Sequence, residues 1–224
     1  MNSTQSHAEE VGRPWDADLR DLDPRQRYKL LVGLVVPRPI ALVSTLGSNG
    51  VRNAAPYSFF NVFSEDPPIV AIGIGGEGTS ASPYKDTLRN VLDTGEFVVN
   101  LVDEPLLHAM NVSAIAFPSG TDEFDEAGFV AAPSVQVAAP RIAAAPVAFE
   151  CRRYAVVALG DRGRQLLLGE IVHVHVRAGL IDPETLDVEG LPLIGRLHGR
   201  GWYARTTDRL EKPRITLQEW EATD

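Results

Sequence analysis

Two stretches of the 224-residue chain combine residue types that could bind a flat, phosphorylated ligand. Lys85, Asp86 and Thr87 come at the start of a predicted helix, where they offer one cation, a hydroxyl and backbone N–H groups without helical partners. Upstream, residues 53–61 are rich in small side chains, so their backbone amides could lie against a heteroaromatic ring. Loops of this composition also simply turn. The residues alone therefore leave both interpretations open.

A glycine pattern suggests a second chemistry. Gly73, Gly75 and Gly78 have the spacing of a dinucleotide-binding loop and follow a predicted strand. In a dinucleotide fold such glycines bring a phosphate against the N-terminus of the helix that follows at once. Pro83 stands where that helix would run. We therefore favour a glycine-rich loop that leaves a barrel strand, with the dinucleotide fold as the weaker alternative.

Two histidines could bind a metal. His173 and His175 are two residues apart in a predicted strand and so share one of its faces. A metal site needs at least one more ligand, and no recognisable motif places Asp161, Glu170 or Asp182 beside the pair. We therefore predict polar residues on the outer face of a half-buried strand, and no metal site.

The single cysteine, Cys151, is a candidate nucleophile only in a suitable setting. A reactive thiol needs electropositive, partly exposed surroundings that lower its pKa. The neighbouring Glu150 supplies none, so the sequence predicts a buried packing residue. One cysteine also excludes an internal disulfide, as expected of a protein from a reducing cytoplasm.

The overall composition argues against two classes of partner. A net charge of −9 with no basic cluster disfavours nucleic acid. No apolar stretch approaches the ~20 residues that span a bilayer, and residues 1–20 lack the apolar core of a secretory signal. We expect a cytoplasmic protein that binds neither nucleic acid nor membrane.

The pattern of elements predicts a mainly β protein. Strands joined by hairpins, with a few short helices, favour one antiparallel β-barrel domain over residues 21–224, preceded by a flexible arm over 1–20. Asn49-Gly50 is a typical hairpin corner. The predicted strands are 40–45, 51–55, 69–74, 97–102, 149–159 and 165–176; the predicted helices are 24–31, 85–92, 105–110 and 122–127, with an extended connection over 131–146.

Several of these segments together resemble a known family. Residues 38–47, 53–61, 66–68, 85–87 and 95–100, in this order and spacing, resemble the flavin reductase-like domain family. The resemblance runs from about Arg38 to Tyr203. It implies an antiparallel split β-barrel of the FMN-binding type, with FMN as cofactor and FAD as a possible substitute.

The resemblance also implies roles for individual residues. The flavin ring and ribityl chain would lie against one strand and the loop after the next. Lys85 and Thr87 would hold the phosphate, with Asp86 as helix cap. The implied cofactor-binding residues are Ser44, Thr45, Asn53, Ala55, Pro56, Ser58, Phe59, Lys85, Asp86 and Thr87.

The implied activity is hydride transfer from NADH or NADPH to FMN. The flavin performs this chemistry, so no catalytic side chain is assigned. His198 and Tyr203 are candidates for the nicotinamide side of the site. Family members are typically homodimers, and a monooxygenase partner could receive the reduced flavin. The alternative is an FMN-binding module, or an FMN-dependent oxidoreductase without NAD(P)H:flavin reductase activity.

Overall fold

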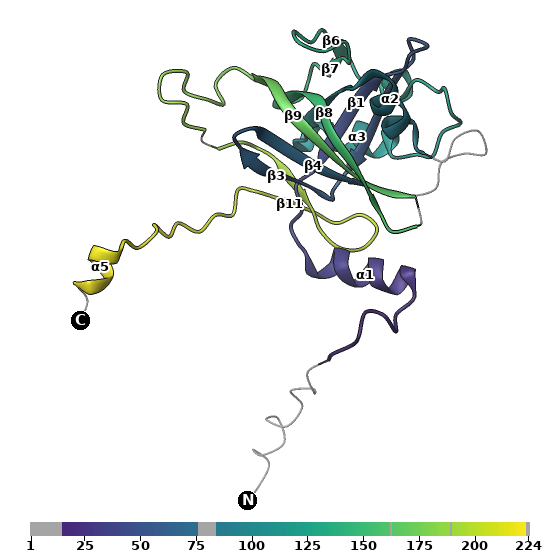
Figure 1. The fold of residues 1–224 in the computed structure, drawn as a ribbon. Coiled ribbons are helices and arrows are strands. Elements are labelled where there is room, and N and C mark those ends of the chain that lie inside the picture. Colours follow the sequence, from purple (N-terminus) through teal and green to yellow (C-terminus); the bar gives the residue numbers. More distant parts are fainter. Residues whose placement is uncertain (1–14, 76–83, 162, 189, 223–224) are drawn as a thin grey trace, which may run out of the picture.

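The computed structural model describes residues 15–75, 84–161, 163–188 and 190–222 (Figure 1). The expectations for residues 1–14 of the arm, for Gly78 and for Pro83 lie outside these ranges. Within them, no helix combines the length and the apolar character needed to cross a membrane.

One antiparallel seven-stranded sheet forms the body of the protein, in the order β2-β1-β5-β8-β9-β4-β3. The predicted fold class, mainly β with short helices, is confirmed. The sheet is not closed, because β2 and β3 lie at its two edges. The strands are β1 (Ala41–Leu46), β2 (Arg52–Tyr57), β3 (Phe60–Glu65), β4 (Pro68–Ile74), β5 (Glu96–Leu101), β8 (Val147–Leu159) and β9 (Arg164–Val176).

Strand β4 decides between the two readings of the glycine pattern. It pairs antiparallel with both of its neighbours, β3 and β9. A dinucleotide fold requires a parallel strand–helix–strand unit, so this alternative is wrong. Gly73 instead allows a close approach, since a Cβ there would lie 3.0 Å from the Cβ of Phe59.

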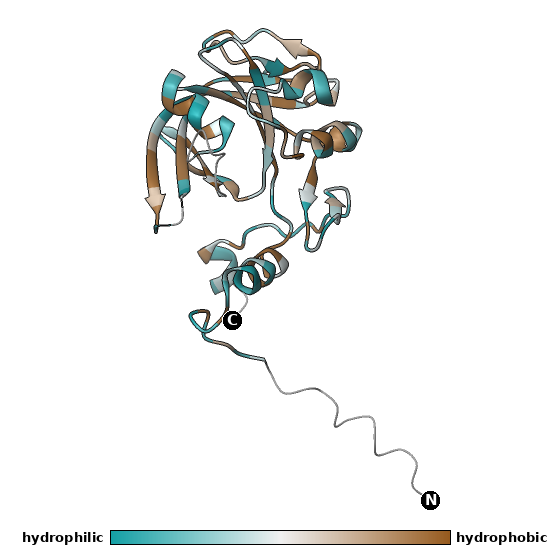
Figure 2. Ribbon diagram, turned by 90° about the vertical axis from the view of Figure 1, so that its right-hand side faces the viewer, coloured by the Kyte–Doolittle hydropathy of each residue, from teal (hydrophilic) through white to brown (hydrophobic). Residues whose placement is uncertain are grey.

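The main core lies inside the curved sheet, where Figure 2 shows brown hydrophobic stretches along the strands. Phe97 of β5 is fully buried there and packs against Gly169 of β9. A Cβ at Gly169 would come within 2.2 Å of the Phe97 ring, so only glycine fits. Cys151 is buried in the same core, which confirms the prediction of a packing thiol.

Short helices and hairpins surround the sheet. Helices α2, α3 and α4 contact β2, whereas Figure 1 shows α1 and α5 away from the sheet body. Helix α1 begins at Pro24, as predicted, and continues to Leu34. The other bounds are α2 (Asp86–Thr94), η1 (Glu104–Leu106), α3 (Leu107–Ser113), α4 (Glu123–Ala127), α5 (Leu217–Glu221), β6 (Ala131–Ala132), β7 (Arg141–Ile142), β10 (Ile194–Arg196) and β11 (Tyr203–Arg205).

The extended connection of residues 131–142, which we call the strap, covers the outer face of β5 and β8. Buried polar side chains of the sheet hold it. Ser44 donates from its hydroxyl to the carbonyl of Pro140 at 2.6 Å, and Asn100 accepts from the amide of Ile142 at 2.9 Å. Val137 and Ala139 of the strap also pack with Val98 and Ala148 of the sheet in a small apolar cluster. The strap therefore covers part of the outer sheet face, which the sequence pattern predicted to be exposed to solvent.

Candidate functional site

A cleft of about 340 Å³ lies where the end of β2, the start of α2 and the segment after α3 meet. It brings together residues 53–57 and 85–87, the two stretches that the sequence singled out. The lining residues are Asn53, Ala55, Pro56, Tyr57, Lys85, Asp86, Thr87, Ser113, Ala114, Ile115, Ala116, Phe117 and Glu123.

A second hollow of about 290 Å³ adjoins the first beside the break between β2 and β3. Pro56, Tyr57 and Lys85 line both, so the two hollows share a wall. Each volume is near the lower end of the range for small-molecule sites. The residues that line the second hollow are Tyr28, Pro56, Tyr57, Ser58, Phe59, Gly73, Gly75, Lys85 and Arg164.

A buried hydrogen-bond network centred on Asn53 supports the first cleft. The carbonyl oxygen of Asn53 accepts from the hydroxyls of Thr87 at 2.8 Å and Thr45 at 3.3 Å. Thr45 accepts in turn from Asn90 at 2.9 Å, and the Asn53 amide group donates to Glu123 at 2.9 Å. The network joins β1, β2, α2 and α4. The side chains of Asn53, Thr45 and Thr87 therefore fix the wall of the cleft.

Glu123 is a carboxyl group that sequence reasoning missed. It lies in the first turn of α4, is 7% exposed and accepts hydrogen bonds from the side chain of Asn53 and the amide of Ala54. Burial raises its pKa above the ordinary value, and these hydrogen bonds act against that rise only in part. A buried carboxyl group with a raised pKa therefore borders the cleft.

The N-cap residue of α2 does not cap the helix with its own side chain. Lys85 is the N-cap residue and makes no side-chain capping bond. The predicted cap, Asp86, instead forms an ion pair with Arg89 at 2.8 Å and accepts from Ser119. This part of the prediction is wrong, because Asp86 is the first residue inside the helix. No side chain among the described residues caps the first-turn amides, which lie at the cleft beside the Lys85 cation.

Tyr57 supplies a polar atom that lacks a partner. Its hydroxyl is buried at the wall of both hollows, lies near the hydroxyl of Thr87, and makes no hydrogen bond of good geometry to another described residue. Burial raises its pKa to about 12, so the group stays protonated. A buried O–H group without a partner is costly, and an acceptor atom of a bound ligand would satisfy it. The unpaired hydroxyl, the uncapped helix and the small-residue wall fit a phosphorylated heteroaromatic cofactor such as FMN.

Arg38 connects the second hollow to distant parts of the chain. The side chain is buried and donates to the carbonyls of Val32 and Val35 at the end of α1, at 2.6 and 2.8 Å. It also donates to the hydroxyl of Ser58 at 3.3 Å and the carbonyl of Leu197 at 3.2 Å. Arg38 thus sets the position of Ser58 relative to α1 and the β10–β11 hairpin.

Not all predicted site residues reach the clefts. Ser44 lies beneath the strap and Thr45 lies in the network behind the wall. His198 is exposed in the β10–β11 turn, and Tyr203 stacks against Arg196, whose guanidinium is 4.7 Å from the ring centroid. Neither His198 nor Tyr203 lines either hollow. The structure adds residues 113–117, a run of small and apolar side chains that no sequence motif marked as part of a site.

The fold and the cleft together define a class: flavin-binding oxidoreductases built on an open antiparallel barrel. Residues 33–194 match the model of the flavin reductase-like domain, and the chain belongs to that family.

Similar proteins agree with this assignment. An uncharacterized protein of Deinococcus radiodurans is 41% identical over 91% of each chain. The structure of 2-nitrobenzoate 2-nitroreductase NbaA from Pseudomonas fluorescens has a TM-score of 0.82 and 39% identity, over 91% of this chain and 98% of that one. Nitrilotriacetate monooxygenase component B from Bacillus cereus has a TM-score of 0.82 and 31% identity, over 89% and 99%.

Proposed function

We propose that this protein binds FMN in the paired hollows and uses it to oxidise NADH or NADPH. The observation that carries the proposal is the meeting of the small-residue end of β2 with the uncapped start of α2 in one cleft. The helix amides and Lys85 suit a phosphate, and residues 53–58 leave room for a flat ring. FAD could occupy the same hollows, with its additional nucleotide extending toward solvent.

The protein's own part in this reaction is positional. When bound, the flavin supplies the hydride chemistry. Lys85 and the amides of Asp86 and Thr87 would hold the phosphate, and the Asn53 network keeps the β2 wall fixed. The Tyr57 hydroxyl would be available to donate a hydrogen bond to an acceptor atom of the cofactor. His198 and Tyr203 would have to approach through movement of the β10–β11 hairpin, or from a second subunit, to serve the nicotinamide.

A homodimer is part of the proposal. Edge strand β3 exposes Val62 to 54% and Phe63 to 71%. An apolar, unpaired edge is a liability for a monomer, and a second copy would cover it. We expect a dimer mass by light scattering, and expect Phe63→Glu to yield monomers. A wild-type monomer would contradict this part of the proposal.

The electron acceptor has two candidates. The similarity to component B of nitrilotriacetate monooxygenase supports delivery of reduced flavin to a separate oxygenase. The similarity to NbaA supports direct reduction of a nitroaromatic compound on the bound flavin. Anaerobic single-turnover experiments separate them, because a nitroaromatic acceptor would reoxidise bound flavin at a rate that does not depend on added free flavin.

Flavin titration followed by visible absorption tests the proposal first. We expect bound FMN to bleach anaerobically on addition of NADH or NADPH. Lys85→Ala should raise the FMN dissociation constant about 10- to 100-fold, because a hydrogen bond to a charged group contributes about 1.5–3 kcal/mol. Lys212→Ala, which removes an exposed lysine of the C-terminal segment, is the matched control. Absence of FMN binding, or equal binding by both variants, would refute the site.

A further inference from the structure

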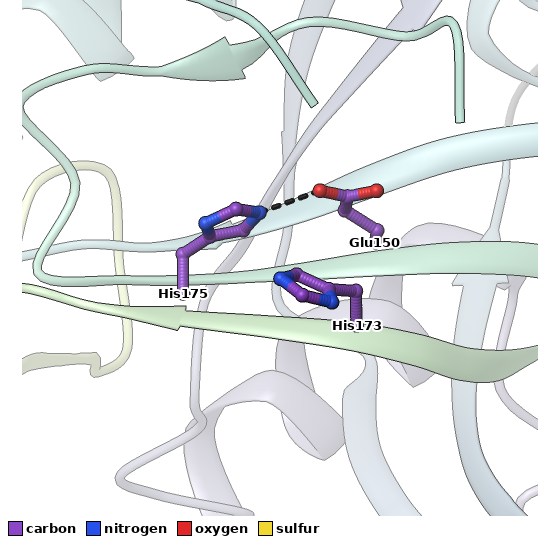
Figure 3. Close-up of side chains that lie close together, drawn as sticks. All are labelled: Glu150, His173 and His175. Atoms are coloured by element: carbon purple, nitrogen blue, oxygen red, sulfur yellow. Dashed lines mark hydrogen bonds and ion pairs between the residues drawn. The ribbon is translucent and has the colours of Figure 1, made fainter. Parts of the chain in front are cut away.

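Two imidazoles and one carboxylate meet on the outer face of β8 and β9, beside the strap (Figure 3). One potential ligand atom from each of Glu150, His173 and His175 lies within 4.8 Å of the other two. Nε2 of His175 is 2.5 Å from Oε1 of Glu150, and the two imidazole centroids are 4.6 Å apart. None of the three residues lines the clefts described above.

Strand pairing explains why these residues meet. Glu150 of β8 is the direct partner of His173 on β9, and His175 follows two residues later on the same face. The third ligand that a histidine pair requires thus comes from the neighbouring strand, 23 positions upstream of His173, where no sequence motif would indicate it. A third potential ligand is therefore present, at a position other than Asp161, Glu170 or Asp182.

The carboxylate of Glu150 is fixed in place and charged. The residue is fully buried and accepts the backbone amides of Val135, Gln136 and Val137 in the strap, at 2.8, 2.6 and 3.2 Å. Burial alone would raise the pKa of Glu150, but the hydrogen bonds from His175 and the strap amides outweigh it and lower the pKa. The strap therefore supports the carboxylate as hydrogen bonds to metal ligands usually do.

His173 completes the cluster with an unused donor atom. The residue is partly buried, and no hydrogen bond joins it to another described residue. Figure 3 shows its ring directed toward the Glu150–His175 pair. A ring nitrogen of His173 is thus free to bind a cation beside a fixed negative charge. Because both histidines are only partly buried, solvent can reach the cluster and supply a water ligand.

We propose that Glu150, His173 and His175 bind a divalent transition metal of the zinc type, at a site separate from the flavin cleft. Two imidazole nitrogens and one carboxylate oxygen suit zinc, with water in the fourth position. Magnesium and calcium prefer oxygen ligands throughout.

Metal binding would replace the hydrogen bond between His175 Nε2 and Glu150 Oε1. The proton of this bond would move to Nδ1 of a neutral imidazole, or to solvent from an imidazolium, and both atoms would then bind the metal at about 2.0–2.2 Å. Because Glu150 also holds three strap amides, the metal would fasten the strap to β8 and β9.

The experiment uses the untagged full-length protein, freed of metal by a chelator. Calorimetric titration with zinc chloride should give one bound equivalent, and cobalt(II) should give the visible absorption of a low-coordinate site. Magnesium should give neither signal. His173→Ala should weaken zinc binding at least tenfold. Loss of a residue that only hydrogen-bonds to a metal ligand already lowers metal affinity about 10- to 100-fold. His173 makes no hydrogen bond to another described residue, so this variant should fold, as circular dichroism would verify.

His108→Ala is the matched control, because His108 is exposed on α3 and distant in sequence from the cluster. It should bind zinc like the wild type. Glu150→Gln is a second test of the ligand set, but it also weakens the strap. Absence of zinc uptake by the wild type would overturn the proposal and leave Glu150–His175 as an ion pair that anchors the strap. Equal zinc affinity of His173→Ala and the wild type would also overturn it.

Discussion

Replacement of Arg38 by methionine should destabilise the protein through one buried side chain. Methionine keeps the length of the apolar stem and removes every donor. The guanidinium has no carboxylate partner among the described residues; four oxygen atoms surround it instead. Two of them are carbonyls at the C-terminal end of α1, where a cation is also favoured by the helix dipole. The substitution therefore removes the fastening between α1, Ser58 and the β10–β11 hairpin.

The distances set the expected size of the effect. The bonds to Val32 and Val35, at 2.6 and 2.8 Å, are short and contribute most. The bonds to Leu197 and Ser58, at 3.2 and 3.3 Å, contribute little. Hydrogen bonds of a charged group contribute about 1.5–3 kcal/mol each. Part of their loss is offset, because the variant no longer has to bury a charged guanidinium. We expect a net loss of about 3 kcal/mol, which lowers the melting temperature of a chain of this size by about 6–12 °C.

Thermal unfolding by circular dichroism measures this loss, and Arg205→Met is the control. Arg205 also holds two carboxylate oxygens of Glu104, but both side chains are exposed. Exposed pairs contribute less than about 1 kcal/mol. If the melting temperatures of the Arg38 and Arg205 variants agree within about 2 °C, the argument that burial and short bonds make Arg38 important is refuted.

Two further predictions concern the core and the cleft. Gly169→Ala should lower the free energy of unfolding by about 1–3 kcal/mol, because the new Cβ meets the Phe97 ring at 2.2 Å. The control is Gly33→Ala in α1, which should not destabilise the protein because nothing lies within 4 Å of the new Cβ. Equal melting temperatures of the two variants would contradict the packing argument. Burial raises the pKa of Glu123, so the stability it contributes is greatest below the ordinary value of 4.5 and is lost as pH rises through the raised pKa. The melting temperature of Glu123→Gln should therefore decline less than that of the wild type as pH rises over that window. If the two pH profiles are the same, Glu123 is not the cause of the decline.

Local patterns predicted most of the sheet, because their signals lie within a few residues. The Asn49-Gly50 corner, the buried run that became β4 and the long β8–β9 hairpin all appear in the structure. Strand β3 was not predicted, since its side chains are mostly exposed and show no alternation. The three-residue strands β10 and β11 are too short to carry a pattern.

The candidate site was predicted where its parts are contiguous in sequence. Residues 53–57 and 85–87 do meet in one cleft. Residues 113–117 and Glu123 join it only because α3 and α4 pack against β2, which is a tertiary effect. Glu150 reaches His173 through strand register, which spacing along the chain does not reveal. Long-range pairing, rather than residue type, is the information that the sequence patterns lacked.

The Asn53 network has a consequence for charge movement. Hydroxyl groups can pass a proton along a chain because each is both donor and acceptor, whereas the amide of Asn53 accepts on one atom and donates from another. The Asn53 amide group therefore does not pass a proton between Glu123 and the hydroxyl groups of Thr45 and Thr87. Displacement of α2 by a ligand would instead shift Thr87, Asn53 and, through Asn53, Glu123 of α4.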